Sequence, residues 1–186
     1  MSDVAAQPFA GTYVAQPTAS TFAFAVRHSD TFWFRGRVPE VEARLGAGGD
    51  GLVLEGSARV ESISIEEPEA MREHVLGPDF FDTGRHPEVT FRSTDIRLLA
   101  DDRVELDGEL TIAGITRPVS AGGRYTGTRQ VSFGAIAALE LHTTIDRRDF
   151  GFDWQMELPN GGLTLSWEVQ LDIDLLLIRE APNGDA

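Results

Sequence analysis

The chain of 186 residues contains no cysteine, and this absence removes several kinds of site together. Disulfides, thiol nucleophiles, cysteine-bound zinc and iron–sulfur clusters all depend on the missing thiol. Basic residues are scarce too, with 16 Lys and Arg against 30 Asp and Glu, so the formal net charge is -14. Such a surface repels nucleic-acid phosphates and anionic membranes. We therefore exclude nucleic acid as a partner and expect only a weak approach to membranes.

Long apolar runs are also missing. The chain has no window near the roughly 18 consecutive apolar residues that a membrane-spanning helix needs, so no integral membrane association is expected. No basic residue precedes Arg27, and the N-terminal residues contain no apolar run of about seven or more. These features differ from those of a signal peptide, and we expect a cytoplasmic protein.

Three glycines match the spacing of a dinucleotide-binding motif. Gly46, Gly48 and Gly51 have the G-x-G-x-x-G spacing of dinucleotide-binding loops. That motif requires a helix directly after it, whereas Leu52 starts another alternating segment. A hairpin loop is therefore the better interpretation of these glycines.

The histidines show no metal-binding pattern. All four stand at least 12 residues apart and form neither H-x-H nor H-E-x-x-H, so the sequence predicts no metal site. There is no G-x-S-x-G nucleophile motif, and carboxylates are too numerous for a catalytic pair to stand out. The sequence thus predicts no catalytic residue and no cofactor.

Apolar and polar residues alternate with a period of two along most of the chain, between turns rich in the 19 Gly and nine Pro. This pattern is typical of antiparallel strands. It is clearest over residues 163–177, where every odd position is apolar. A strand of that length extends about 50 Å, so it must bend around a core or run the length of a tall barrel. The other expected strands are residues 21–27, 31–37, 41–45, 52–60, 89–96, 104–112, 119–125 and 131–145.

One short helix is expected after Pro68. Glutamates in its first turn favour the positive end of the helix dipole, and Gly77 with Pro78 would end it. Met71 and Val75 are four residues apart, so they would share its buried face.

The all-β pattern fits either a sandwich or a closed barrel. We expect one domain over residues 1–186, with a core at about 12–178 and frayed tails. Eleven Phe against two Tyr leave most of the aromatic surface without a polar group, so it requires an apolar interior. That interior is either a packed core or a pocket for one small ligand, and the pattern favours neither.

Four stretches, in order along the chain, carry a family resemblance. They are Phe22-x-Phe24-x-Val26-x-His28 with Phe34-Arg35-Gly36, the segment 71–87, the segment 108–119, and Ile145-Asp146-Arg147-Arg148-Asp149-Phe150-Gly151. Together they resemble the YceI-like family of lipid-binding proteins over roughly residues 12–178. The resemblance implies a lipocalin-like antiparallel β-barrel of about eight strands with one short helix. It also implies that a long-chain amphiphile, a polyisoprenoid or an isoprenoid quinone, occupies an elongated apolar interior without a metal or covalent cofactor.

The candidate ligand-binding residues follow from the strand faces and from the resemblance. They are Phe22, Phe24, Val26, His28, Phe34, Phe80, Phe91, Arg147, Asp149, Phe150, Leu165, Trp167, Val169 and Leu171. Arg147 and Asp149 are expected to share one strand face, where they would pair with each other. Alternatively, Arg147 would bind a pyrophosphate at the barrel mouth. Of Phe80 and Phe81, one is expected to plug the barrel end and the other to face outward.

The leading hypothesis is a non-enzymatic carrier or store of an isoprenoid-type lipid, with that lipid as its partner. One alternative is a structural or stress-response scaffold with a packed barrel. Another is an enzyme acting on a bound lipid or quinone, for which His28 and His142 are the candidate titratable groups. A homodimer is expected from the resemblance and from the uncovered strand edges of a partly open barrel.

Overall fold

The computed structural model describes residues 8–48, 51–65, 68–156, 158–159 and 161–181. Its strands are β1 (Thr12–Ala15), β2 (Thr21–His28), β3 (Phe32–Val38), β4 (Val41–Gly48), β5 (Gly51–Arg59), β6 (Glu88–Leu98), β7 (Arg103–Ile112), β8 (Ile115–Val131), β9 (Gly134–Asp146) and β10 (Leu165–Arg179). The helical elements are α1 (Glu69–Leu76) and the 3₁₀ turns η1 (Pro17–Ala19), η2 (Val60–Ser62) and η3 (Arg147–Phe150). The predicted tails are residues 1–6 and 181–186, and all of these residues except Ala181 lie outside the described residues.

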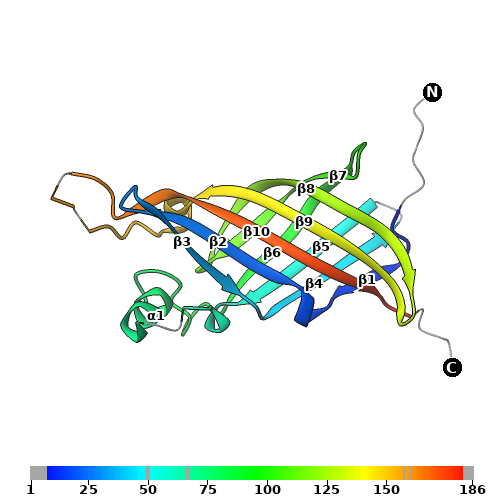
Figure 1. The fold of residues 1–186 in the computed structure, drawn as a ribbon, viewed down its shortest axis with the longest axis horizontal. Coiled ribbons are helices and arrows are strands. Elements are labelled where there is room, and N and C mark those ends of the chain that lie inside the picture. Colours follow the sequence, from blue (N-terminus) through cyan, green and yellow to red (C-terminus); the bar gives the residue numbers. More distant parts are fainter. Residues whose placement is uncertain (1–7, 49–50, 66–67, 157, 160, 182–186) are drawn as a thin grey trace.

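The ten strands form one antiparallel sheet in the order β1-β4-β5-β6-β7-β8-β9-β10-β2-β3, and β1 also pairs with β10. This extra pairing closes β1 and β4 to β10 into an eight-stranded barrel, from which β2 and β3 continue as a hairpin (Figure 1). The predicted all-β barrel of about eight strands with one short helix is thereby confirmed. The hairpin interpretation of the glycine motif also holds, because β4 and β5 pair through Gly48 and Gly51.

The last strand, β10, changes partners along its length. Its residues from Leu165 to Asp174 pair with β2, and its last residues pair with β1. The predicted alternation holds from Val169 to Leu177, but a register shift against β2 interrupts it between Leu165 and Val169. The barrel is therefore closed by β1 at one end, while at the other end β2 and β3 leave the closed ring.

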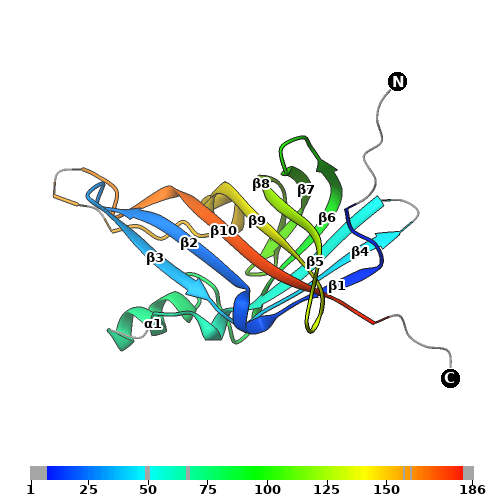
Figure 2. The same cartoon turned by 45° about the vertical axis from the view of Figure 1, so that its right-hand side comes forward.

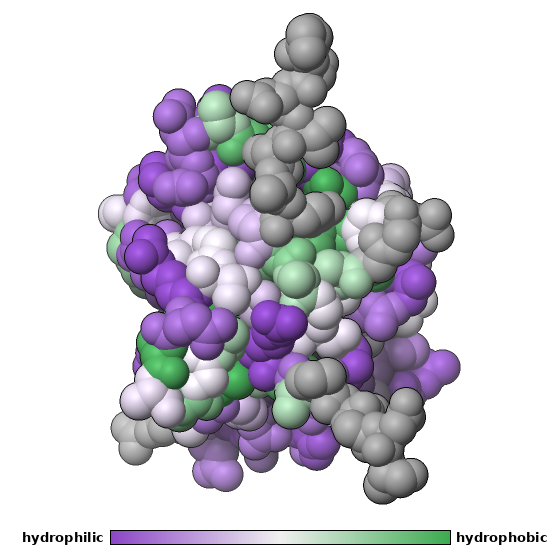
Figure 3. Space-filling model, turned by 90° about the vertical axis from the view of Figure 1, so that its right-hand side faces the viewer, coloured by the Kyte–Doolittle hydropathy of each residue, from purple (hydrophilic) through white to green (hydrophobic). Residues whose placement is uncertain are grey.

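The short strand β1, which the alternation did not predict, closes a tightly packed end of the barrel. Tyr13 and Leu177 are fully buried there, beside Phe9 and Leu45 at 1% exposure. The Tyr13 ring meets Phe9 edge-on at 5.8 Å, and its hydroxyl lies 2.5 Å from Thr128 Oγ1. Figure 3 views this end of the molecule, where hydrophilic side chains surround a paler, more apolar centre. We call this region the closed end.

The opposite end carries α1, the turn of the β2–β3 hairpin and the connection from β9 to β10 (Figures 1 and 2). The free edge of β3 is held to the segment before α1, because Ser64 N donates to Arg37 O at 2.8 Å and Arg37 N donates to Ser64 Oγ at 2.9 Å. We call this region the open end. Within the described residues, no helix is both long enough and apolar enough to cross a bilayer.

The helix α1 starts after Pro68 and ends before Gly77, as predicted, but none of its residues is fully buried. Met71 is 37% exposed and Val75 is half-buried, so the prediction that they would be buried is wrong. The reason is that both side chains line an interior cavity beneath the helix.

Candidate ligand-binding cavity

A cavity of about 180 Å³ lies inside the open end. Its walls come from α1, from the inward faces of β2 and β10 and from the segment after η3, and they are almost entirely apolar. A space of this size holds one ring-sized group without rearrangement. The sequence composition left a packed core and a pocket equally open, and the structure contains the pocket.

A second apolar cavity of about 90 Å³ continues toward the middle of the barrel. The two cavities adjoin at Phe22, Val89 and Leu171, which line both. The interior therefore offers an elongated apolar path, interrupted at these three side chains.

Two strand glycines give phenylalanine rings room to lie along the wall. A Cβ on Gly36 would stand 2.4 Å from Phe24 Cζ, and a Cβ on Gly108 would stand 2.4 Å from Phe91 Cζ. Any larger residue at either glycine would push the ring away from the sheet. Because each ring lies against a glycine, it stays close to the sheet while lining a cavity.

Most of the candidate residues meet at this interior. Eleven of them line the cavity at the open end: Phe22, Phe24, Val26, His28, Phe34, Phe80, Arg147, Phe150, Leu165, Val169 and Leu171. Phe91 lines the second cavity. Asp149 is exposed and lines neither, and Trp167 also lies outside both linings.

The expected pairing of Arg147 with Asp149 on a strand face is wrong, because both residues belong to the 3₁₀ turn η3. The turn begins where Asp146 accepts a hydrogen bond from Arg148 N at 2.9 Å. Asp146 also pairs with the Arg148 guanidinium, and hydrogen bonds from Arg148 lower the pKa of Asp146. The real ion pair is therefore Asp146–Arg148, and the turn points Asp149 into solvent.

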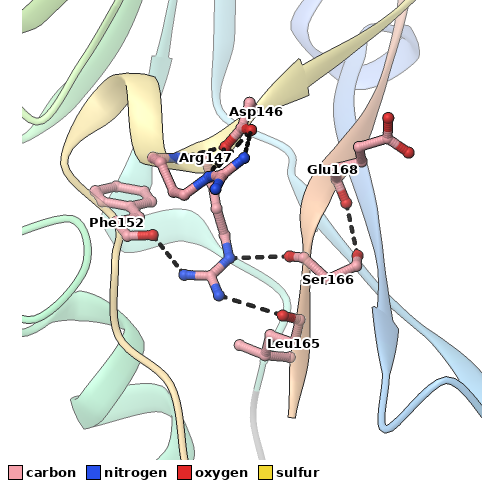
Figure 4. A network of polar contacts seen from close by, with 7 residues as sticks. Asp146, Arg147, Phe152, Leu165, Ser166 and Glu168 are labelled. Carbon is pink, nitrogen blue, oxygen red and sulfur yellow. Dashed lines mark hydrogen bonds and ion pairs between the residues drawn. The ribbon is translucent and has the colours of Figure 1, made fainter. Parts of the chain in front are cut away.

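The guanidinium of Arg147 is buried and holds the backbone around the cavity (Figure 4). Its Nε donates to Ser166 O at 2.9 Å, its Nη2 donates to Leu165 O at 3.3 Å, and its Nη1 donates to Phe152 O. Burial lowers the pKa of Arg147. These carbonyls, and no carboxylate, are its partners in the described structure, so three of its N–H groups are committed to tying η3 and the following segment to β10.

Trp167 leaves the cavity wall because of the register shift in β10. Its ring packs against two guanidinium groups, at 4.4 Å from Arg147 Cζ and 4.8 Å from Arg148 Cζ. Such cation–π contacts stabilise the arginines without offering the ring to a ligand. The tryptophan that does line the cavity is Trp154.

The model of the YceI-like domain family matches residues 13–177. The chain belongs to the YceI-like family. A UPF0312 protein of Azotobacter vinelandii is 30% identical over 94 residues, which cover 50% of this chain and 49% of that protein. A UPF0312 protein of Shewanella sp. strain W3-18-1 is 31% identical over 123 residues, 65% of this chain and 61% of that protein. The chain thus spans about half to three fifths of the length of these curated relatives.

Two solved structures share the fold of this YceI-like chain. Burkholderia cenocepacia BcnA superposes with a TM-score of 0.72 at 19% identity, over 87% of this chain and 98% of that one. A domain from Saccharophagus degradans, described as polyisoprenoid-binding, superposes with a TM-score of 0.68 at 12% identity, over 90% and 98%. Because the sequence identities are this low, the structural similarity establishes only the barrel fold.

The histidines of the YceI-like barrel occupy different environments. His28 lines the cavity, and its ring stacks on Phe32. Its Nδ1 lies 3.0 Å from Ser29 Oγ. His142 is exposed on β9 and lines neither cavity. Within the described ranges, no group of three or more His, Cys, Asp or Glu side chains could hold a metal ion.

Several cavity residues were not among the candidate ligand-binding residues: His74, Phe81, Phe152, Trp154 and the α1 pair Met71 and Val75. The expectation that Phe80 or Phe81 faces outward is wrong, since both line the cavity and contact the Phe152 ring, at 5.8 and 5.2 Å. A signal for the others existed: Phe152 and Trp154 stand two residues apart directly after the fourth family stretch, and an extended segment turns such residues to the same side.

Proposed function

We propose that this YceI-like protein binds and carries or stores a long-chain amphiphile, a polyisoprenoid or an isoprenoid quinone, with the apolar chain inside the barrel. The observation that carries the proposal is the elongated apolar interior, two adjoining cavities that begin beneath α1. The polyisoprenoid-binding description of the Saccharophagus degradans domain supports the same ligand class.

The size of the interior defines how binding would proceed. Cavities of about 180 and 90 Å³ are smaller than the roughly 300 Å³ or more of typical ligand pockets, so a long chain must displace part of the wall. The helix α1 buries none of its own residues, which makes it the wall element whose displacement disturbs the least packing. A chain burying about fifteen carbons gains roughly 12 kcal/mol, which leaves about micromolar affinity after an association cost of about 4 kcal/mol.

A binding role without catalysis fits the side chains at the cavity. His142, one candidate for an enzyme, points away from the interior, and His28 has a hydroxyl neighbour at its Nδ1. No carboxylate residue lines the cavity at the open end within the described structure. The packed-scaffold alternative is disfavoured by the empty apolar volume. The homodimer and the cytoplasmic location remain predictions.

The test is native mass spectrometry of the purified protein, with organic extraction and identification of any bound lipid. We expect a stoichiometric adduct of prenyl-lipid mass, either co-purified or acquired after incubation with geranylgeraniol or a short-chain ubiquinone. A protein that keeps its apo mass under all of these conditions would contradict the proposal and favour the scaffold.

A further inference from the structure

His74 on α1 carries an unusual polar atom. Its Nε2 is buried and has no hydrogen-bond partner, the only such side-chain atom among the residues the structure describes. Other polar groups at the same cavity are engaged: Thr164 Oγ1 donates to Met156 O, Arg147 donates to three carbonyls, and His28 contacts Ser29. A buried polar atom left unpaired costs stability, so a partner is to be expected in one functional state.

The surroundings of His74 fix the orientation and chemistry of its ring. Phe80 and Trp154 meet the imidazole edge-on, with centroids at 5.1 and 5.0 Å. Asp79 Oδ2 stands 3.8 Å from Nδ1. A carboxylate on that side favours the tautomer with the proton on Nδ1 and leaves a lone pair on Nε2. In that tautomer the unpaired atom is a hydrogen-bond acceptor, and it belongs to a residue of the apolar cavity lining.

We propose that Nε2 of His74 accepts a hydrogen bond from a hydroxyl group on the head of the bound lipid. The ligand class is then a prenyl-type chain ending in an alcohol, or a quinol whose phenolic hydroxyl takes the same place. This inference rests on the proposed function and narrows its head group. The Asp79 carboxylate acts through the ring, as a positioning group that keeps the proton on Nδ1 and the lone pair on Nε2.

The charge of the cavity agrees with a neutral head group. Arg147 is the one permanently charged residue in the described lining, and three of its N–H groups already donate to backbone carbonyls. All 16 basic residues of the chain are arginines, so no lysine ammonium is available either. A pyrophosphate would meet a single guanidinium with only two of its five N–H groups left to donate, whereas a hydroxyl needs only the acceptor that His74 supplies.

The test compares three ligands that share the geranylgeranyl chain and differ in head group: geranylgeraniol, its methyl ether and geranylgeranyl pyrophosphate. Dissociation constants are measured by fluorescence titration for the wild type, for His74→Phe, which keeps an aromatic ring without an acceptor, and for His74→Gln, which keeps an acceptor. We expect the wild type to bind the alcohol about tenfold more tightly than the ether. His74→Phe should remove this preference and leave the affinity for the ether within about twofold, while His74→Gln should retain part of the preference.

Folding is followed separately by thermal melting. His74→Phe should melt at the same or a higher temperature, because it removes an unpaired buried atom, and Asp79→Asn should fold normally and weaken the preference for the alcohol.

Three outcomes would overturn the inference alone: equal wild-type affinity for alcohol and ether, an unchanged preference in His74→Phe, or tighter binding of the pyrophosphate. Absence of binding by all three ligands would overturn the proposed function itself, and the two failures are therefore distinguishable.

Discussion

The two ends of the barrel use similar side chains in opposite ways. At the closed end, Phe9, Tyr13, Leu45, Val104 and Leu177 are all at most 1% exposed. At the open end, Met71 is 37% exposed, no residue of α1 is fully buried, and residues of the helix and of the barrel line a cavity of about 180 Å³. Both ends are made mainly of apolar residues, so hydrophobicity does not distinguish them.

The difference between the two ends comes from the strands that pair with β10. Its last residues pair with β1, which pairs in turn with β4, so the ring is closed and the interior is narrow. Farther back, β10 pairs with β2 and the β2–β3 hairpin leaves the ring. One continuous strand thus borders a packed core and a hollow one. We therefore expect stability to reside mainly at the closed end and the proposed binding to reside at the open end.

The largest expected effect comes from the same truncation at the two ends of β10. Leu177→Ala removes a fully buried side chain and should lower the free energy of unfolding by about 3 to 4 kcal/mol. Leu165→Ala removes a side chain that already borders empty space, and should cost only about 1 kcal/mol. Urea denaturation of both variants measures the difference. Equal losses of unfolding free energy in the two variants would contradict the proposal that stability resides mainly at the closed end.

Arg147→Met should come next, with a loss of about 2 to 3 kcal/mol. The substitution keeps the volume but leaves the carbonyls of Phe152, Leu165 and Ser166 without their charged donor. Because this network ties η3 to β10 beside the cavity, lipid uptake in native mass spectrometry should fall as well. Arg147→Lys keeps the charge without the planar fork and should recover only part of the loss. A variant with wild-type stability would show that the network is dispensable.

Enlarging a valine should have opposite consequences at the two ends. Val104→Phe overfills the closed end and should cost about 1 to 3 kcal/mol without affecting a ligand at the other end. Val169→Phe extends into the cavity, so it should leave stability unchanged or slightly higher while preventing lipid uptake. Thermal melting and native mass spectrometry report the two properties. Retained uptake in Val169→Phe would place the ligand elsewhere.

The smallest effect is expected on the outer face of β10, away from both interiors. Burial and the neighbouring carboxylates Glu140 and Asp172 raise the pKa of Asp174, which lies directly across from Glu140. The folded state therefore holds this proton more tightly than the unfolded state, and stability falls as the pH rises from the ordinary pKa of aspartate to the raised value.

Asp174→Asn should accordingly raise the urea midpoint slightly at pH 7 and have no effect near pH 3, where the native carboxyl is already protonated. Lipid affinity should not change, because Asp174 lines neither cavity. The same gain at both pH values would contradict the electrostatic cause.

Alternation was sufficient to predict most of the barrel and one face of its interior. Phe22, Phe24 and Val26 were placed on the cavity wall because β2 is regular throughout, and its register with β10 is continuous from Val26 to Thr21. Strand β1 was missed because four residues are too few to show a period. Its place depends on pairing with β4 and β10, which are distant in sequence.

The errors at the site share a cause: local backbone departures that a period-two pattern does not reveal. Trp167 was assigned inward by parity, and the register shift between Leu165 and Val169 removed it from the lining. Asp149 was assigned to a strand, but Asp146 caps a 3₁₀ turn there instead. His74 was missed because its importance comes from an unpaired atom, which only the packing around it makes visible.

The central claim, that the ligand occupies the open end, is tested most directly by fluorescence quenching with a brominated prenyl or alkyl chain. Of the three tryptophans, only Trp154 lines a cavity in the described structure. We predict saturable quenching of tryptophan fluorescence in the wild type and loss of most of this quenching in Trp154→Phe. The matched control Trp33→Phe should keep the quenching. Equal quenching in wild type and Trp154→Phe would place the chain outside this cavity and contradict the account.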